Sequence, residues 1–177
     1  MESRMTRGAG LAVVGMVALT AACRLETHAP RRGASASVLA AAADSTAVMQ
    51  ELVAYYRDFS ARDWEAFADH FWPGADITTV WRPPDEAAVR VVATSIPDFV
   101  RQAPRGPGSR QVFEERMLDA RLTTFRDLAQ VWVRYHARFG DPGAVSEWEG
   151  VDAVTLMRHD GRWRIVGLAF LGDDAGS

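Results

Sequence analysis

The sequence predicts an α+β fold in which helices come first and a long antiparallel sheet follows. Three observations support this prediction. Apolar residues recur at helical spacing over residues 44–72, alternating apolar and polar residues dominate after residue 110, and turn dipeptides separate the alternating stretches. Helices grouped before strands are typical of α+β domains.

A first helix is expected over residues 44–62. Its apolar residues lie at spacings of three, four or one, which places them on one face of an α-helix. The other face is polar. The apolar stripe comprises Val48, Leu52, Tyr55, Tyr56 and Phe59.

A second, shorter helix is expected next. Asp63 is a suitable N-cap because its carboxylate can accept a hydrogen bond from a free backbone N–H group. The Pro-Gly pair at residues 73–74 ends this helix. Its apolar stripe comprises Trp64, Phe67, Ala68 and Phe71, and Trp72 falls just beyond it.

Two short strands are predicted over residues 75–81 and 89–94, because both stretches are rich in β-branched residues. The first ends in Trp81. Ser95 then caps a short helix that runs from Ile96 to about Ala103, and a loop rich in glycine and proline follows over residues 104–110.

A long hairpin is predicted around a two-residue turn at Arg126 and Asp127. This register gives one wet face and one dry face, as a half-buried antiparallel pair requires. The wet face pairs Glu115 with Arg138, Met117 with His136, Asp119 with Arg134, and Arg121 with Trp132; the dry face pairs Leu118 with Tyr135, Ala120 with Val133, and Leu122 with Val131.

A second hairpin is predicted around Asp160 and Gly161, a pair well suited to a tight turn. Its register places Asp152 on the more apolar face. The expected pairs are Leu156 with Ile165, Val154 with Gly167, and Asp152 with Ala169.

The N-terminus has the composition of a secretory signal, with two arginines before a short apolar run. Cys23, the single cysteine of the chain, follows the letters LTAA, which resemble the lipobox of bacterial lipoproteins. That resemblance implies cleavage before Cys23, acylation of the cysteine, and export to the cell envelope with a lipid anchor on the periplasmic or another extracytoplasmic face. The alternative is an ordinary cleaved signal with an incidental cysteine.

These features divide the chain into a signal peptide over residues 1–22, a flexible tether over 23–43, one domain over 44–173 and a tail over 174–177. The tether assignment rests on a composition rich in alanine, serine and arginine without an apolar period. The formal net charge of −3 and the absence of a basic cluster argue against nucleic acid as a partner.

In this order and spacing, the elements resemble the nuclear transport factor 2-like superfamily, also called SnoaL-like. The resemblance covers about residues 45–172, and three stretches carry it: RDWEAFADHFWPGADI, FRDLAQVWVRYHARFG and GVDAVTLMRHDGRWRIVGLAF. It implies a curved antiparallel sheet wrapped around the N-terminal helices, cone-shaped with a central cavity. It implies no single function, because members include isomerases, polyketide cyclases, dehydratases and transport adaptors.

Ketosteroid isomerases within that superfamily use a tyrosine on the first helix, a protonated aspartic acid on the sheet, and a carboxylate base on the first strand. The resemblance places the tyrosine at Tyr55 and the sheet acid at Asp152. The base would fall at residues 78–80, where the sequence has no carboxylate. An isomerase-type reaction therefore lacks its proton-abstracting group.

The candidate ligand pocket follows from these placements. Trp72 and Trp81 are candidates for the cavity mouth, and Tyr135 faces inward. The candidates are Tyr55, Trp72, Trp81, Tyr135 and Asp152. The alternative for the two tyrosines is a plain core position, and for Asp152 a structural acid bonded to the backbone or to Arg158.

The sequence supports neither a metal site nor a cofactor. Its four histidines do not cluster, and it contains no nucleophile elbow and no phosphate-binding loop. We expect no cofactor.

Three functions remain open. The first is a non-catalytic envelope lipoprotein that binds a small apolar or amphipathic molecule in the cone. The second is an isomerase, dehydratase or cyclase in which Tyr55 and Asp152 polarise a carbonyl. The third is an interaction module whose sheet forms a homodimer or docks another protein. The expected partners are thus a small molecule, the membrane through the lipid anchor, and a second copy of the chain.

Overall fold

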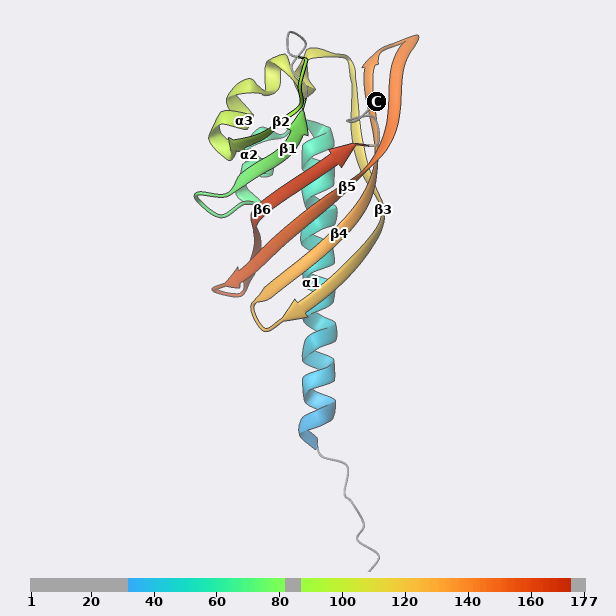
Figure 1. The fold of residues 1–177 in the computed structure, drawn as a ribbon. Helices are drawn as coiled ribbons and strands as arrows, with labels where there is room; N and C mark the ends of the chain where they lie inside the picture. The colour runs from blue at the N-terminus through green and yellow to red at the C-terminus, as the bar shows by residue number, and fades with distance from the viewer. Residues whose placement is uncertain (1–31, 82–86, 173–177) are drawn as a thin grey trace, which may run out of the picture. The chain divides into compact units, whose positions relative to one another are not determined.

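The computed structural model describes residues 32–81 and 87–172 (Figure 1). The predicted signal peptide and Cys23 lie outside the described residues. Within them, the predicted α+β class is confirmed, with two helices before a six-stranded sheet and a third between its second and third strands. The helices are α1 (Arg32–Ala61), α2 (Trp64–Asp69) and α3 (Ile96–Gln102), followed by the 3₁₀ turns η1 (Ala103–Arg105) and η2 (Pro107–Ser109).

Helix α1 buries the stripe that the periodicity predicts, since all five of its apolar residues are buried. The helix begins at Arg32, inside the range expected to be a tether. The physical reason is local, because alanine has the highest helix propensity and the stretch before residue 44 is rich in it. An apolar period predicts only a helix with a core-facing side, so it does not predict this part of α1.

Both short helices have the predicted caps. The Asp63 carboxylate accepts a hydrogen bond from the Ala66 N–H at 3.1 Å and starts α2. The Ser95 hydroxyl accepts one from the Asp98 N–H at 3.3 Å and starts α3. These bonds satisfy backbone donors that the first turn of a helix leaves free.

The sheet has the strand order β2-β1-β6-β5-β4-β3. Every neighbouring pair is antiparallel except β1 and β6, which run parallel. The strands are β1 (Asp76–Trp81), β2 (Arg90–Ser95), β3 (Val112–Phe125), β4 (Leu128–Asp141), β5 (Ala144–His159) and β6 (Arg162–Gly172).

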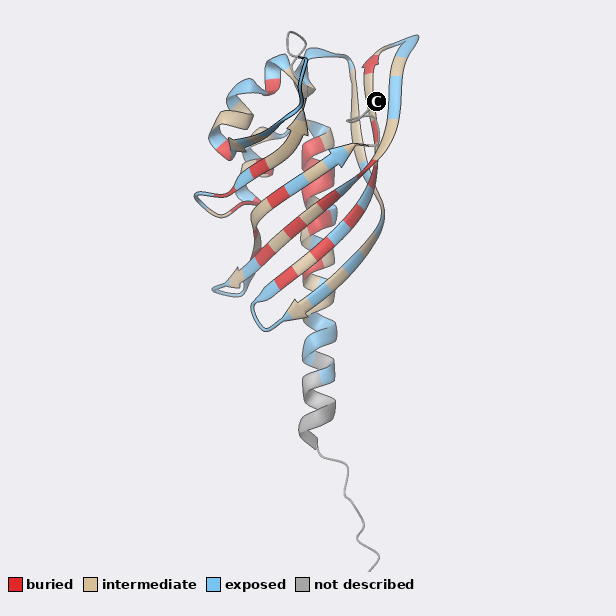
Figure 2. Ribbon diagram, viewed as in Figure 1, coloured by how far each residue is buried: buried red, intermediate tan, exposed pale blue. Residues whose placement is uncertain are grey.

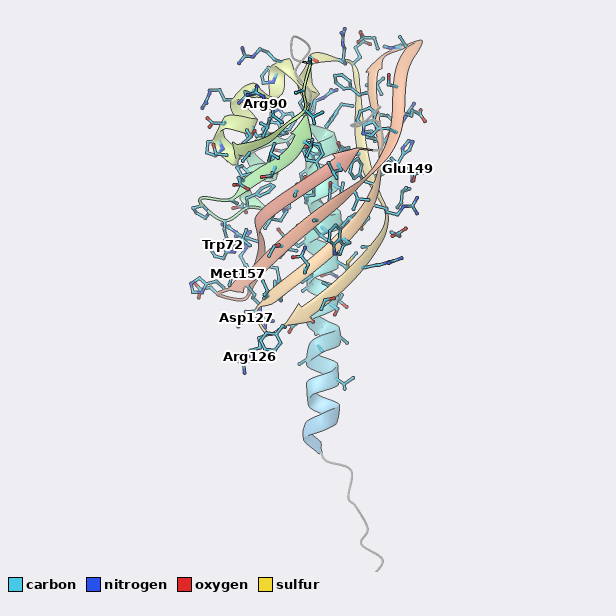
Figure 3. The ribbon with its side chains drawn as sticks, in the orientation of Figure 1. Trp72, Arg90, Arg126, Asp127, Glu149 and Met157 are labelled. Atoms are coloured by element: carbon cyan, nitrogen blue, oxygen red, sulfur yellow. The ribbon has the colours of Figure 1, made fainter. Side chains whose placement is uncertain are left out.

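The β3–β4 hairpin turns at Arg126 and Asp127 as predicted, with a left-handed φ of 55° at Arg126 (Figure 3). The predicted register holds from Asp119, opposite Arg134, to the turn. A β-bulge between Met117 and Asp119 shifts the rest by one residue. The predicted pairs Glu115–Arg138, Met117–His136 and Leu118–Tyr135 are therefore wrong, and the observed pairs are Glu114–Arg138, Glu115–Ala137, Arg116–His136 and Met117–Tyr135.

The β5–β6 hairpin shows the same pattern. Its turn at Asp160 and Gly161 and the Leu156–Ile165 pair are as predicted. A register shift between Thr155 and Leu156 then moves the partners by one residue. The predicted pairs Val154–Gly167 and Asp152–Ala169 are wrong, since Val154 lies opposite Leu168 and Asp152 opposite Phe170.

Helix α1 runs along one face of the sheet (Figure 1). Buried residues alternate with exposed ones along β4, β5 and β6, and the buried side of α1 faces them (Figure 2). The core therefore lies between α1 and this face, which we call the inner face. Asp152, which the predicted alternation placed on the apolar side, belongs to the inner face.

Candidate functional site

A cavity of about 270 Å³ lies between α1, α3 and the inner face of the sheet. It is slightly smaller than the about 300 Å³ at which drug-sized ligand sites begin. Apolar and aromatic side chains form most of its wall, with two carboxyl groups among them. The lining residues are Tyr55, Phe59, Ile77, Phe99, Pro107, Phe113, Glu115, Trp148, Asp152, Leu168 and Phe170.

Asp152 forms the polar floor of this cavity. It is only 3% exposed, and its Oδ2 accepts a hydrogen bond from the Tyr56 hydroxyl of α1. Burial raises the pKa of the Asp152 carboxyl to about 7, and the hydrogen bond from Tyr56 opposes part of that rise. The group can therefore exist as a neutral acid or as a carboxylate near neutral pH.

The hydroxyl that reaches Asp152 thus belongs to Tyr56, whereas the sequence favoured Tyr55. Tyr55 also lines the cavity, but its ring belongs to an aromatic cluster with Phe59 and Phe67. Desolvation and the nearby Asp152 raise the pKa of the Tyr55 phenol further above its usual value. Both tyrosines lie on the predicted apolar stripe of α1. Helical spacing alone does not tell which of the two hydroxyl groups reaches Asp152.

Glu115 is a second carboxyl group on the cavity wall, and the sequence placed it on the wet face. The bulge in β3 turns it inward, opposite Ala137. The Ser60 hydroxyl of α1 fixes this position, because it accepts from the Glu115 N–H at 2.8 Å and donates to the Glu115 carbonyl at 2.7 Å. Burial, followed by the charge of Asp152, raises the pKa of the Glu115 carboxyl well above its ordinary value.

Trp72 and Tyr135 do not line this cavity. Trp72 lines a broad groove of about 950 Å³ between α2 and α3, and its indole N–H donates to the Met157 carbonyl at 3.2 Å (Figure 3). Tyr135 is 2% exposed and packs in the core over Gly150, where a Cβ atom would lie 2.3 Å from its hydroxyl. Trp81 ends β1, and its side chain lies outside the described part of the structure.

Arg158, the alternative partner for Asp152, lies elsewhere. Its guanidinium pairs with Asp127 at 2.8 Å and with Asp44. It therefore does not neutralise the acid on the cavity floor.

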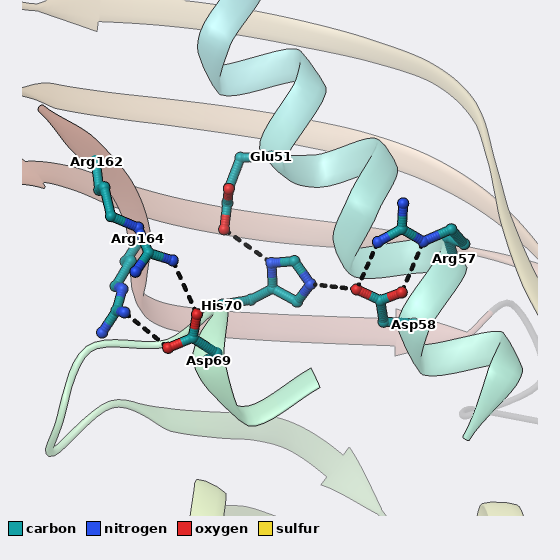
Figure 4. Close-up of polar contacts among 7 residues, drawn as sticks. All are labelled: Glu51, Arg57, Asp58, Asp69, His70, Arg162 and Arg164. Carbon is teal, nitrogen blue, oxygen red and sulfur yellow. Dashed lines mark hydrogen bonds and ion pairs between the residues drawn. The ribbon is translucent and has the colours of Figure 1, made fainter. Parts of the chain in front are cut away.

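A separate polar cluster surrounds His70, and periodicity gave no signal for it. His70 Nδ1 lies 2.8 Å from Glu51, and Nε2 lies 3.0 Å from Asp58 (Figure 4). Arg57 donates to the same Asp58 carboxylate at 2.7 Å. None of these residues lines the cavity, so the cluster connects the end of α2 to α1 rather than forming part of the pocket.

Burial by itself lowers the pKa of His70, but the hydrogen bonds from its ring to the two carboxylates outweigh this effect, and the pKa is raised. The hydrogen bond from Arg57 lowers the pKa of Asp58. The raised pKa of His70 and the lowered pKa of Asp58 both indicate a protonated imidazole between two carboxylates.

The outer face of the sheet carries an apolar patch. Its residues line a shallow hollow of about 550 Å³ across β2, β1, β6, β5 and β4. Contiguous exposed apolar surface on a sheet is typical of an interaction site. The outer patch comprises Thr78, Val80, Val91, Trp132, Val151, Ala153, Ala169 and Leu171.

Two features are absent from the described residues, 32–81 and 87–172. No group of three or more histidine, cysteine, aspartate or glutamate residues there is arranged to hold a metal ion. No helix there is both long and apolar enough to span a membrane.

The cavity therefore combines an aromatic wall with two carboxyl groups and a phenol. Such a site can hold the apolar part of a small molecule and hydrogen-bond its polar group. A carboxyl group that titrates near neutral pH, as Asp152 does, can also donate or accept a proton.

No protein-family model matches the chain, and no curated protein matches its sequence. Solved structures do resemble it. A nuclear transport factor 2-like protein with a cystatin-like fold from Novosphingobium aromaticivorans is 15% identical, with a TM-score of 0.66 over 84% of this chain and 93% of that one. A hexachlorocyclohexane dehydrochlorinase from Novosphingobium barchaimii is 15% identical, with a TM-score of 0.60 over 76% and 90%.

A scytalone dehydratase-like protein from Novosphingobium aromaticivorans is 13% identical, with a TM-score of 0.56 over 73% of this chain and 84% of that one. Identities this low establish a shared fold and leave the reaction open. The chain has the cystatin-like cone fold of nuclear transport factor 2-like proteins.

Proposed function

We propose that the protein binds a small, largely apolar or amphipathic molecule in the cavity between α1 and the sheet. The observation that carries this proposal is the hydrogen-bonded pair of Tyr56 and Asp152 at the floor of a chamber whose wall is mostly apolar and aromatic. A buried polar pair in an aromatic pocket orients a ligand by its one polar group.

Native mass spectrometry of the protein isolated from its own source tests this proposal. We expect a bound small molecule that disappears when Ile77→Phe fills the cavity, because Ile77 lines it. Glu65→Trp is the matched control, since Glu65 lines only the separate groove beside Trp72. A bound molecule that is lost in Glu65→Trp and kept in Ile77→Phe would place the binding site in the groove instead.

A second candidate is an acid–base enzyme of the isomerase, dehydratase or cyclase type. Glu115 favours it, because it brings a carboxyl group into the cavity that the first strand lacks. Among proteins of the same fold, a dehydrochlorinase and a dehydratase-like protein provide precedent for such chemistry. A turnover that falls at least about a hundredfold in Glu115→Gln supports catalysis, whereas binding without turnover supports the first proposal.

We also propose that the mature chain begins at lipidated Cys23 and is exported to the cell envelope. The support is the basic start, short apolar run and lipobox-like letters before Cys23. In Cys23→Ser, the protein should leave the membrane fraction and its mass should lack the acyl chains. A variant that stays in the membrane with unchanged mass would contradict the anchor.

A further inference from the structure

The cavity wall is largely aromatic and carries acidic side chains but no basic ones. Six of its eleven lining residues are aromatic: Tyr55, Phe59, Phe99, Phe113, Trp148 and Phe170. Two are acids, and none is arginine, lysine or histidine. No basic side chain of the lining therefore faces the two acids.

The acids offer free oxygen atoms to the cavity. Asp152 is 97% buried and uses Oδ2 for the Tyr56 hydroxyl, while its Oδ1 has no hydrogen-bond partner among the described residues. The side-chain carboxyl of Glu115 likewise has no hydrogen-bond partner within that part of the chain. The buried side-chain atoms without a hydrogen-bond partner among the described residues are His136 Nδ1 and Trp163 Nε1, so these carboxyl oxygens lie open to the cavity, where a ligand can bind them.

The aromatic rings surround the same space. Phe59 contacts Phe113 edge-on, with ring centroids 5.0 Å apart, and Phe99 at 5.9 Å. Ring faces attract a cation, and the attraction strengthens where water is excluded. Aromatic rings around paired carboxyl groups are a chemical match for an ammonium group.

We propose that the ligand of this cavity is a small organic ammonium compound, whose cationic nitrogen lies between Asp152 and Glu115 and whose apolar part contacts the aromatic wall. This inference rests on the proposed small-molecule binding function and specifies its ligand class. A volume of about 270 Å³ limits the ligand to a compact amine.

The ionisation of the two acids is consistent with this assignment. After burial, the charge of Asp152 contributes to the raised pKa of the Glu115 carboxyl, and an ammonium ion between the two acids would offset that repulsion. The titratable groups facing them are the phenols of Tyr55 and Tyr56 on α1, with Tyr135 of β4 close to Tyr55. Two arginines lie beyond this lining: Arg62, whose guanidinium lies 5.6 Å from the ring centroid of Phe113, and the exposed Arg105 of η1, which lines a neighbouring pocket.

Calorimetric titration of the purified full-length chain with benzylamine and benzyl alcohol tests the assignment. The two probes have nearly the same shape and differ in charge at pH 8. We expect benzylamine to bind at least about tenfold more tightly than the alcohol. Titration in two buffers of different ionisation enthalpy should show release of up to about one proton, because the acids lose protons when the ammonium binds.

Glu115→Gln should reduce the affinity for benzylamine at least about tenfold and leave that for benzyl alcohol nearly unchanged. Glu114→Gln is the matched control, because Glu114 pairs with Arg138 instead and does not line the cavity. Circular dichroism of both variants checks that they fold.

Each outcome bears on a different claim. Tighter binding of the alcohol, or equal loss of amine binding in both glutamate variants, would overturn the ammonium assignment and leave the pocket intact. Loss of binding for both probes in Ile77→Phe would confirm that the cavity is the site. If neither probe binds to the wild-type chain and native mass spectrometry still shows a neutral molecule in the cavity, the ammonium assignment fails while the proposed binding function stands.

Discussion

Asp152 is a carboxyl group that folding favours in its neutral form. Its burial raises the pKa from 3.8 to about 7, and the hydrogen bond from Tyr56 only partly offsets that effect. A raised folded-state pKa means that the group contributes most to stability at low pH. That contribution falls as the pH rises through the unfolded pKa toward the folded one, over about pH 4–7.

Asp152→Asn keeps the shape of the side chain and removes its titration. We expect the variant to gain stability relative to wild type as the pH rises from 4 to 8, by an amount on the order of a few kcal/mol. Urea unfolding at both pH values measures this change. Asp119→Asn is the control, because Asp119 is an exposed acid paired with Arg134 and should show no such gain. A variant that loses stability at pH 8 would mean that Asp152 is an ionised structural acid.

Residue-level prediction from sequence succeeded where alternation was regular and failed next to irregularities. Alternation along β5 put Asp152 on the apolar side, and the structure agrees. It put Glu115 on the wrong face because a one-residue bulge reverses every side chain beyond it. Nothing in the sequence indicates that the hydroxyl of Ser60 on α1 would bond to the backbone of Glu115 on β3 and hold this residue inward.

At the scale of elements, the contact between Ser60 of α1 and the backbone of β3 connects the helix to the bulged part of the strand. Ser60→Ala removes both hydrogen bonds and leaves two partly buried backbone groups without a partner. We expect a loss of about 1–3 kcal/mol in the free energy of unfolding. Ser45→Ala on the same helix is the control, because its hydroxyl bonds only to the exposed Ala41 carbonyl within the helix. Equal effects of the two substitutions would show that the Ser60 contact contributes nothing specific.

The His70 cluster makes the contact between α1 and the end of α2 depend on pH. Since the folded pKa of His70 is raised above 6.5, its stabilising effect is complete below that value and is lost as the pH rises through the folded pKa. His70→Gln should therefore cost more stability at pH 5.5 than at pH 9, as urea unfolding will measure. His159→Gln should show no such dependence, because His159 is exposed near the turn of the second hairpin. A pH-independent cost for His70→Gln would indicate a neutral imidazole in the native state.

Caps and turns were the elements that sequence predicted best. Asp63, Ser95 and the pair Asp160-Gly161 each have a local chemical reason for their position, so no tertiary information is needed. The sequence does not predict that α1 extends back to Arg32. Helix propensity alone is a weak signal, and a composition rich in alanine, serine and arginine favours a tether instead.

For the whole molecule, element order predicted the α+β class, and the resemblance to a known superfamily added the cone. Neither specified which side chains meet inside it. That depends on two bulges and on the depth of neighbouring residues on one helix face, which are properties of the assembled sheet. The sequence also gave no indication that alternate outward residues on five strands would form one apolar patch.

We propose that a second copy of the chain covers this outer patch. Val91 is 71% exposed, Trp132 56% and Leu171 52%, which is costly for large apolar residues on a free surface. Arg134 beside the patch pairs with both Asp119 and Glu149, so the rim carries both signs of charge. Such a surface can meet its own copy across a two-fold axis, where the same patch lies on both sides.

Val151→Asp places a charge in the middle of the patch, on β5 between β4 and β6. Its side chain faces outward, so the change should alter the stability of the monomer by less than about 1 kcal/mol. In the dimer the carboxylate would be buried without a partner, and we expect the dimer dissociation constant to rise more than about tenfold. Sedimentation velocity over a range of protein concentrations measures this constant.

Phe125→Asp is the matched control, because Phe125 is 68% exposed at the hairpin tip and does not line the patch. A wild-type chain that stays monomeric at every concentration, or a dimer that Phe125→Asp weakens as much as Val151→Asp does, would contradict the proposal.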